Sequence, residues 1–257
     1  MGIIIQIKAI LLATFLLFFV LLPAGFIAAP FPIRRRLKII CPAWEFCSRI
    51  LMRYACHVKI HIEDARPEDF KTIPYKGLYV VNHQGYMDIP TLIHITQASP
   101  IMKKEILYVP IFGWLAWVSG AMPVSRASIS SRRKVFDIAK QRILKHNLGL
   151  QVYPEGTRSK DGIPKPFEKI KKTLMVFAFN ENLPVIPVSI YGTRGMLSRY
   201  GFIRPFRKVG LKAHDIMYPK DFSNADEFAR AVWAKVIEGH DYLKDQLGPQ
   251  IGKGSSV

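Results

Sequence analysis

"VVNHQGYMD", residues 80–88, is the most informative segment for the fold of this chain. An apolar run over residues 78–81 leads into it and is typical of a short buried strand. The strand ends at Asn82, His83 follows at once, and Asp88 stands at the start of an apolar helical pattern. This order predicts a strand–turn–helix unit in which His83 and Asp88 lie on either side of a tight turn.

The same alternation of strands and helices continues along the chain. Repeated units of this kind predict an α/β fold, with a largely parallel sheet and helices on its faces. In such sheets ligands bind at the carboxyl ends of the strands, so residues that follow strands are candidate site residues. Strands are expected at 58–62, 78–82, 121–124, 149–153, 185–190 and 209–216, and helices at 89–97, 128–146, 169–180 and 225–246.

The N-terminal part carries 25 consecutive uncharged residues, from Ala9 to Ile33, followed by arginines at 34–36. About 20 apolar residues are enough to span a bilayer. Pro23 and Gly25 leave open a re-entrant or interfacial element, and a signal peptide is a further alternative. The run is long for a signal peptide, and the basic cluster resists translocation. We therefore expect a single N-terminal membrane anchor, with the remaining chain facing the cytoplasm (of a bacterial inner membrane if the source is bacterial).

A second, amphipathic helix is expected over roughly residues 42–57, where apolar residues recur at helical spacing. Such a helix lies on the membrane or packs on the globular part. The chain is thus divided into a membrane-associated two-helix element, residues 1–57, and a globular domain, residues 58–257.

Charge and cysteine content limit the function classes. The 37 basic residues exceed the 19 acidic ones and give a net charge of +18, which favours an anionic partner. Nucleic acid, an anionic membrane surface and a phosphorylated substrate all fit, although no nucleic-acid-binding motif occurs. The three cysteines are odd in number and form no C-x-x-C, which argues against a disulfide framework or a zinc site.

The turn after the first central strand is suited to acid–base chemistry. An aspartate that accepts the Nδ1–H of a histidine fixes the tautomer and leaves Nε2 free as a base. Since the turn holds no serine or cysteine, the base is expected to activate a hydroxyl of the substrate. Taken alone, Asp88 as a helix N-cap and His83 as an ordinary turn residue is the simpler interpretation.

Two further strand ends contribute arginines. "GAMPVSR", residues 120–126, ends at Arg126, and "LQVYPEGTRSKDG", residues 150–162, contains Arg158 after Gly156. Glycine permits close backbone approach, and the guanidinium fork suits phosphate. An exposed loop arginine and a polar turn explain each stretch separately. A histidine, an aspartate and two arginines at three strand ends of one sheet together favour a site.

These residues resemble the glycerolipid acyltransferase family, whose motifs occur here in the same order from about residue 75 to 195. The matching residues are Asn82, His83 and Asp88 of N-H-x4-D, Arg126 after a short strand, P-E-G-T-R-S at 154–159, and V-I-P-V at 185–188 with Gly192 and Thr193.

The resemblance implies that His83 is the general base and that Asp88 orients it and stabilises its charge. The acceptor hydroxyl would attack the thioester of the acyl donor directly, without an acyl-enzyme. Arg126 and Arg158 would hold the phosphate of the acceptor. No cofactor and no metal are implied. The substrate-binding residues implied by the resemblance are Arg126, Glu155, Gly156, Thr157 and Arg158.

The reaction expected from the resemblance is transfer of an acyl chain from acyl-CoA or acyl-carrier protein to 1-acyl-glycerol 3-phosphate, giving phosphatidic acid for phospholipid synthesis. Alternatives are another lyso-lipid, such as lyso-ornithine lipid, or glycerol 3-phosphate as acceptor. A non-catalytic basic membrane-binding module and a metal hydrolase using His83, Asp88 and His94 are more distant alternatives. The sequence departs from the family pattern at Gly85, where many members have serine, and at 168–170, which bears on the acceptor pocket.

Overall fold

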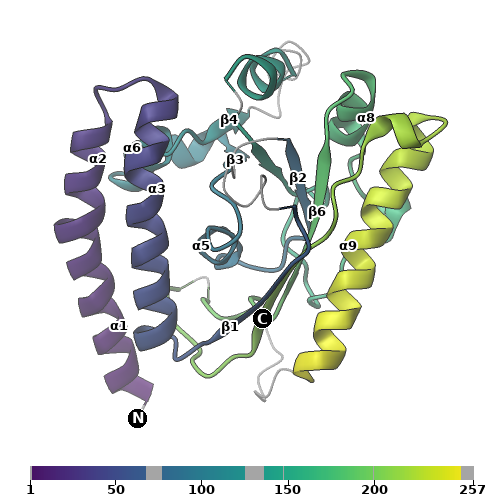
Figure 1. Ribbon diagram of the computed structural model, residues 1–257. Helices are drawn as coiled ribbons and strands as arrows, with labels where there is room; N and C mark the ends of the chain where they lie inside the picture. The colour runs from purple at the N-terminus through teal and green to yellow at the C-terminus, as the bar shows by residue number, and fades with distance from the viewer. Residues whose placement is uncertain (1, 68–76, 125–135, 147, 199, 250–257) are drawn as a thin grey trace.

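One mixed sheet organises the protein. The computed structural model describes residues 2–67, 77–124, 136–146, 148–198 and 200–249 (Figure 1). Within these ranges seven strands follow the order β1-β7-β6-β2-β5-β3-β4, and every neighbouring pair is parallel except β6 with β7. The strands are β1 Ile60–Asp64, β2 Leu78–Val81, β3 Ser99–Lys103, β4 Met122–Val124, β5 Leu150–Val152, β6 Val185–Tyr191 and β7 Val209–Ala213.

The central strand β2 pairs in parallel with β5 on one side and with β6 on the other. All residues of these three strands are buried, which is the pattern of strands covered on both faces. Because parallel strands end at the same edge, the segments that follow β2, β5 and β6 meet there. This edge holds the motif residues that the sequence places after those strands.

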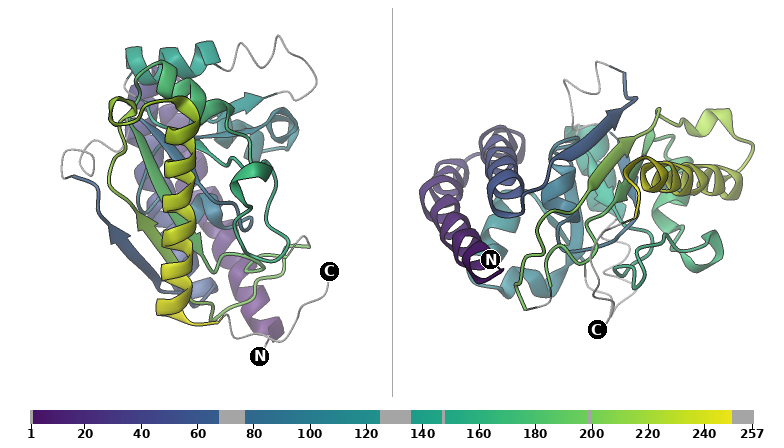
Figure 2. Two further views of the ribbon diagram at one scale, coloured as in Figure 1. Left: turned by 90° about the vertical axis from the view of Figure 1, so that its right-hand side faces the viewer. Right: turned by 90° about the horizontal axis from the view of Figure 1, so that it is seen from below.

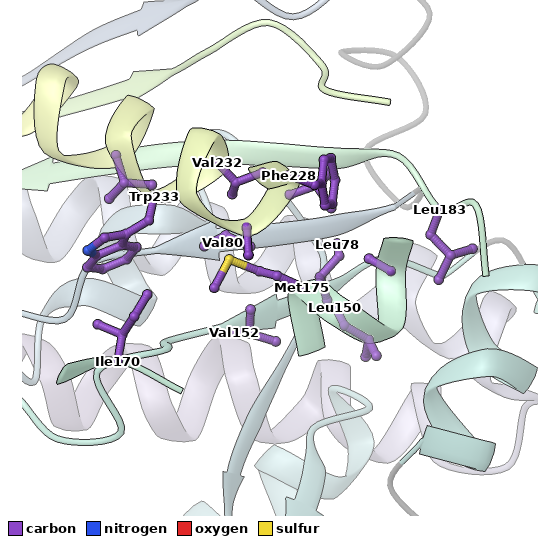
Figure 3. Packing of buried hydrophobic residues seen from close by; sticks show 14 of the residues in the cluster. Leu78, Val80, Leu150, Val152, Ile170, Met175, Leu183, Phe228, Val232 and Trp233 are labelled. Carbon is purple, nitrogen blue, oxygen red and sulfur yellow. The ribbon is translucent and has the colours of Figure 1, made fainter. Parts of the chain in front are cut away.

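Helices cover both faces of the sheet, and successive residues of β2 alternate between them. On one face, α9 Ala225–Leu247 packs its Phe228, Val232 and Trp233 against Val80 (Figure 3). Trp233 Nε1 also donates a hydrogen bond of 2.8 Å to the Lys165 carbonyl, so its buried polar atom is satisfied.

The opposite face carries a second apolar cluster, which includes Tyr79 and Val81 of β2 and Leu92 of the short helix α5 Asp88–Leu92. The two clusters on opposite faces explain why β2 is apolar at every position. They also fix the position of the turn between β2 and α5 relative to the sheet, because buried side chains hold both ends of this turn.

The N-terminal residues form a helical hairpin beside the sheet (Figures 1 and 2). The first arm is one continuous helix, Gly2–Ala28, long and apolar enough to cross a membrane by length and composition, with most side chains exposed. The return arm is α3 Ile33–Ile50, extended by a π-helical turn at Leu51–Ala55. The first arm remains helical through Pro23 and Gly25. Gly25 packs closely against Trp114, because a Cβ at this position would lie 2.7 Å from the Trp114 ring.

The predicted fold class is confirmed, whereas several element bounds differ. The return helix begins at Ile33 and not near residue 42, and the helix expected at 89–97 ends at Leu92. Strand β3 and helix α6, Phe112–Val118, were not predicted, since β3 contains Pro100 and α6 is too short to show a clear period. Of the helix expected at 128–146, residues 136–146 are helical and 125–135 lie outside the described residues.

Candidate active site

The His83–Asp88 pair forms as the sequence predicts. His83 Nδ1 lies 2.6 Å from Asp88 Oδ2, and the aspartate is fully buried while 23% of the histidine side chain is exposed. An ionised carboxylate only accepts hydrogen bonds, so Nδ1 carries the hydrogen and Nε2 carries the lone pair. The pair therefore presents Nε2 of a partly exposed imidazole as the proton-accepting nitrogen.

Asp88 is held by three more donors. The backbone N–H of Gln84 donates to its Oδ2 at 2.7 Å, and that of Gly85 lies 3.0 Å from both carboxylate oxygens. The Thr193 hydroxyl donates to Oδ1 from the segment that follows β6. Both oxygens of this fully buried carboxylate therefore have hydrogen-bond donors. These donors also fix the position from which Asp88 orients His83.

The absence of a side chain at Gly85 allows two segments to pack closely. A Cβ at this position would lie 2.7 Å from the Thr193 carbonyl oxygen, a distance that real Cβ atoms essentially never show. The turn after β2 and the segment after β6 thus touch through their backbones. A serine at position 85, as in many members of the family that the chain resembles, would require the backbone at Thr193 to shift.

Two amides of the turn bind the neighbouring strand ends. Asn82 donates from Nδ2 to the Ile190 carbonyl at 2.9 Å and accepts the Ile190 N–H at 2.8 Å. Gln84 accepts the Gly192 N–H at 2.9 Å and donates to the Gly162 carbonyl at 2.7 Å. The turn is therefore fastened both to β6 and to the loop after β5. Sequence reasoning did not single out Gln84, because its partners are distant in the chain.

Glu155 lies beside His83 in the loop after β5. It is buried, its Oε1 accepts the His83 N–H at 3.4 Å, and its Oε2 has no hydrogen-bond partner among the described residues. Burial raises the pKa of this carboxyl to about 7. The loop is also joined to the turn by the Ser159 N–H, which donates to the His83 carbonyl at 2.7 Å.

Tyr153 forms the wall behind the imidazole. Its ring centroid lies 4.4 Å from that of His83. Its buried hydroxyl has no partner among the described residues, and burial raises its pKa well above the ordinary value. Tyr153 therefore remains neutral and holds the imidazole by ring packing.

The predicted arginines have different outcomes. The Arg158 guanidinium lies 3.6 Å above the ring centroid of Tyr86, which belongs to the turn that carries His83. This contact places Arg158 against the turn that carries the candidate base. Gly156, with φ of +68°, makes the left-handed bend that precedes it, and Thr157 Oγ1 accepts from Lys165 Nζ at 3.0 Å. Arg126 lies outside the described residues and stays a prediction.

His94 does not join the pair. Its Nε2 lies 3.1 Å from the Ser48 hydroxyl on α3, and burial lowers the pKa of His94 to about 4. Among the residues that the structure describes, no three histidine, cysteine or acidic side chains lie close enough to hold a metal ion together. The ligand set of His83, Asp88 and His94 considered for a metal hydrolase is therefore not assembled.

The raised pKa of Glu155 predicts a pH dependence of stability. A carboxyl whose pKa is higher in the folded chain than in the unfolded chain favours folding fully below the ordinary value, 4.5, and loses that contribution as the pH rises through about 7. Between pH 4.5 and 8 the free energy of unfolding of the wild type should fall by on the order of 2–3 kcal/mol more than that of Glu155→Gln.

Denaturant unfolding in detergent over this pH range measures the difference. Glu105→Gln, at an exposed position, is the matched control and should follow the wild type. If the free energy of unfolding has the same pH dependence in the wild type and in Glu155→Gln, the pKa of Glu155 is not raised by folding.

Comparison with known proteins assigns the chain to a family. A 1-acyl-sn-glycerol-3-phosphate acyltransferase from Arabidopsis thaliana chloroplasts is 30% identical over 249 residues, covering 93% of this chain and 64% of that protein. The Haemophilus influenzae 1-acyl-sn-glycerol-3-phosphate acyltransferase is 28% identical over 141 residues, covering 54% and 57%. The chain thus spans less than two thirds of the length of either relative.

A crystal structure of the 1-acyl-sn-glycerophosphate acyltransferase from Thermotoga maritima matches with a TM-score of 0.78 and 25% identity, over 96% of this chain and 98% of that one. The acyltransferase family model matches residues 57–191, which contain the turn, the Pro154–Ser159 loop and β6. With just over half of its length matched by the family model, this chain belongs to the acyltransferase family.

Proposed function

We propose that this protein transfers an acyl chain from an acyl thioester to the free hydroxyl of 1-acyl-sn-glycerol 3-phosphate, giving phosphatidic acid. The observation that carries the proposal is the 2.6 Å contact between His83 Nδ1 and the buried Asp88, with Arg158 laid over the same turn. The names of the two relatives and of the matching structure support the acceptor.

In this proposal His83 Nε2 takes the proton from the acceptor hydroxyl as its oxygen attacks the thioester carbonyl. A bond forms between that oxygen and the carbonyl carbon, and the tetrahedral intermediate then breaks its carbon–sulfur bond. The imidazolium returns the proton to the leaving thiolate, so the enzyme ends as it began. Asp88 stabilises the imidazolium in between, and its four donors keep the carboxylate in place.

Phosphate recognition is proposed for Arg158 together with Arg126. A guanidinium binds phosphate through charge-assisted and often bidentate hydrogen bonds. Glu155, Gly156 and Thr157 shape the pocket beside Arg158: the glycine sets the bend, and Lys165 bonds both the Glu155 carbonyl and the Thr157 hydroxyl at 3.0 Å. The donor is acyl-CoA or acyl-carrier protein, because both are acidic and suit a chain of charge +18.

Membrane attachment is proposed for residues 1–57, with residues 58–257 as the acyltransferase domain. Support comes from the apolar helix Gly2–Ala28, whose side chains are mostly exposed, and from the basic residues that follow it. Cytoplasmic placement of the domain is proposed because such basic clusters prefer that side. Since Gln6, near the start of the helix, also contacts Ile203 of the domain, the helix is proposed to insert from that side without crossing.

A panel of acceptors with both donors, using the purified protein in detergent, tests the proposed reaction. Lysophosphatidate should be acylated faster than lyso-ornithine lipid, lysophosphatidylethanolamine or glycerol 3-phosphate. A better rate with any of these would replace the acceptor and keep the acyl-transfer chemistry. Absence of transfer to all acceptors from both donors would contradict the proposed function.

Removal of the base should abolish most of the activity. His83→Ala is expected to lower kcat by about 10²–10⁴-fold or more, the usual contribution of a positioned general base. The wild-type rate should also fall at acid pH, because a protonated imidazole cannot accept a proton. His61→Ala, at an exposed histidine of β1, is the control and should retain wild-type kcat. Near-normal turnover by a folded His83→Ala protein would overturn the assignment.

Arg158 is expected to contribute to kcat/KM mainly for acceptors that carry a phosphate. Arg158→Ala is expected to lower kcat/KM for lysophosphatidate about ten- to a hundredfold, since a hydrogen bond to a charged group contributes roughly 1.5–3 kcal/mol. Arg158→Lys should restore little, because the ammonium lacks the planar fork. The loss should shrink on a neutral monoacylglycerol. An equal loss on both acceptors would mean that Arg158 holds the Tyr86 turn and does not bind the phosphate.

The anchor should withstand salt. Membranes washed at high ionic strength are expected to keep the protein, because an inserted apolar helix is not held by screened charges. A reporter fused after Val257 should be protected from reagents applied outside the cell. Release by salt alone, or labelling of the reporter from outside, would contradict the proposed attachment or its orientation.

A further inference from the structure

Three arginines gather in the segment between β6 and β7. A Cβ at Gly195 would lie 3.4 Å from Arg204 Nη1 and 3.6 Å from Arg207 Nη2, so both guanidinium groups reach the same point. Arg194, the residue before this glycine, donates from Nη2 to the Lys160 carbonyl. The cluster therefore lies next to the loop that carries Arg158.

The cluster carries a net positive charge, which the carboxylate of Asp161 offsets in part at Arg194. Within the described residues none of the three arginines forms an ion pair with a carboxylate. Burial, followed by the charges of Arg204 and Arg194, lowers the pKa of Arg207. The neighbouring guanidinium groups repel one another, and a bound anion would offset this repulsion.

The surroundings of the cluster suit contact with a bilayer surface. Gln6 of helix α1, Gly2–Leu16, accepts the Ile203 N–H at 2.8 Å and donates to the Ile203 carbonyl, which fastens the segment to the apolar helix. Beside it, Phe202 and Phe206 are 59% and 61% exposed, and Ile7 of α1 is 53% exposed. Exposed aromatic rings next to arginines at the end of an apolar helix are typical of the level of lipid headgroups.

We propose that Arg194, Arg204 and Arg207 form a binding site for the phosphate of an anionic membrane phospholipid, with Phe202 and Phe206 inserted beside it. The inference rests on the proposed membrane attachment of α1. A donor phosphate would neutralise the arginines equally well but would leave both phenylalanine rings in water, so the lipid is favoured.

The site is connected to the candidate active site through the chain itself. Thr193, whose hydroxyl donates to Asp88, directly precedes Arg194, and the Arg194 Cα lies 3.5 Å from where a Cβ at Gly85 would stand. A lipid bound to this cluster holds the turn of His83 at the membrane surface. The proposed acceptor is itself a lipid at that surface, so the base meets it there.

Fluorescence quenching by brominated lipid tests the site without requiring turnover. Phe202→Trp introduces an indole in the loop. The wild type and the variant share four tryptophans, so the emission of the introduced indole is obtained by subtracting the wild-type emission from that of the variant. The full chain is placed in nanodiscs of phosphatidylcholine containing dibrominated phosphatidylglycerol or dibrominated phosphatidylcholine. We expect phosphatidylglycerol to quench the introduced indole at a lower mole fraction.

Charge removal should abolish this preference. Arg204→Gln with Arg207→Gln is expected to weaken the apparent affinity for phosphatidylglycerol roughly 10- to 30-fold, given the usual contribution of an arginine at an anionic surface. Lys235→Gln with Lys244→Gln removes the same charge from exposed positions of α9, across the sheet from α1 (Figure 1), and should change nothing. If the double arginine variant does not fold, Arg204→Gln alone, at an exposed position, should still weaken the preference.

Three results would overturn the inference: equal quenching by both lipids, the same loss in the α9 control, or removal of the lipid preference by added coenzyme A. The last would assign the cluster to the acyl donor. An enzyme that transfers no acyl group but keeps the lipid preference would contradict the proposed function and leave this site intact.

Discussion

The buried carboxylate of Asp88 determines how the site is arranged. A charge without contact with water costs several kcal/mol unless it is paired and hydrogen-bonded. Here the imidazole of His83, two backbone N–H groups of the turn and the Thr193 hydroxyl supply the donors. The turn after β2 can take no other form without losing some of them, and β6 must end where Thr193 reaches the carboxylate.

The parallel arrangement of β2, β5 and β6 brings the donors and the Asp88 carboxylate together. Strands in register end together, so a turn, a loop and a strand end that are far apart in sequence form one network. Within it two carboxyl groups have different surroundings. Asp88 has donors on both oxygens, whereas Glu155 accepts a long hydrogen bond from the His83 N–H and its Oε2 has no partner among the described residues. Burial and the nearby charge of Asp88 both raise the pKa of Glu155.

Sequence reasoning succeeded where the signal is local. The continuous apolar runs of β2 and β6, and the polar residues that follow β2, define both the strand ends and the His83–Asp88 pair. It did not find the contact of Thr193 with Asp88 or the role of Gln84, because those hydrogen bonds join segments more than 100 residues apart. Strand β3 was missed for a similar reason: with Pro100 inside it, its pairing partners and not its own pattern make it a strand.

The network also bears on the alternative of a non-catalytic basic membrane module. Such a module accounts for the charge of +18 and for the apolar helix, and it needs only surface arginines and exposed rings. It gives no reason to bury Glu155 with an oxygen that has no partner in the described structure, or to place a partly open imidazole over a fully buried aspartate. Proteins retain costly buried polar groups mainly where function requires them. The energetic cost of the strand-end network therefore favours catalysis, and the arginine cluster next to it is best understood as the means by which that catalysis is held at the membrane.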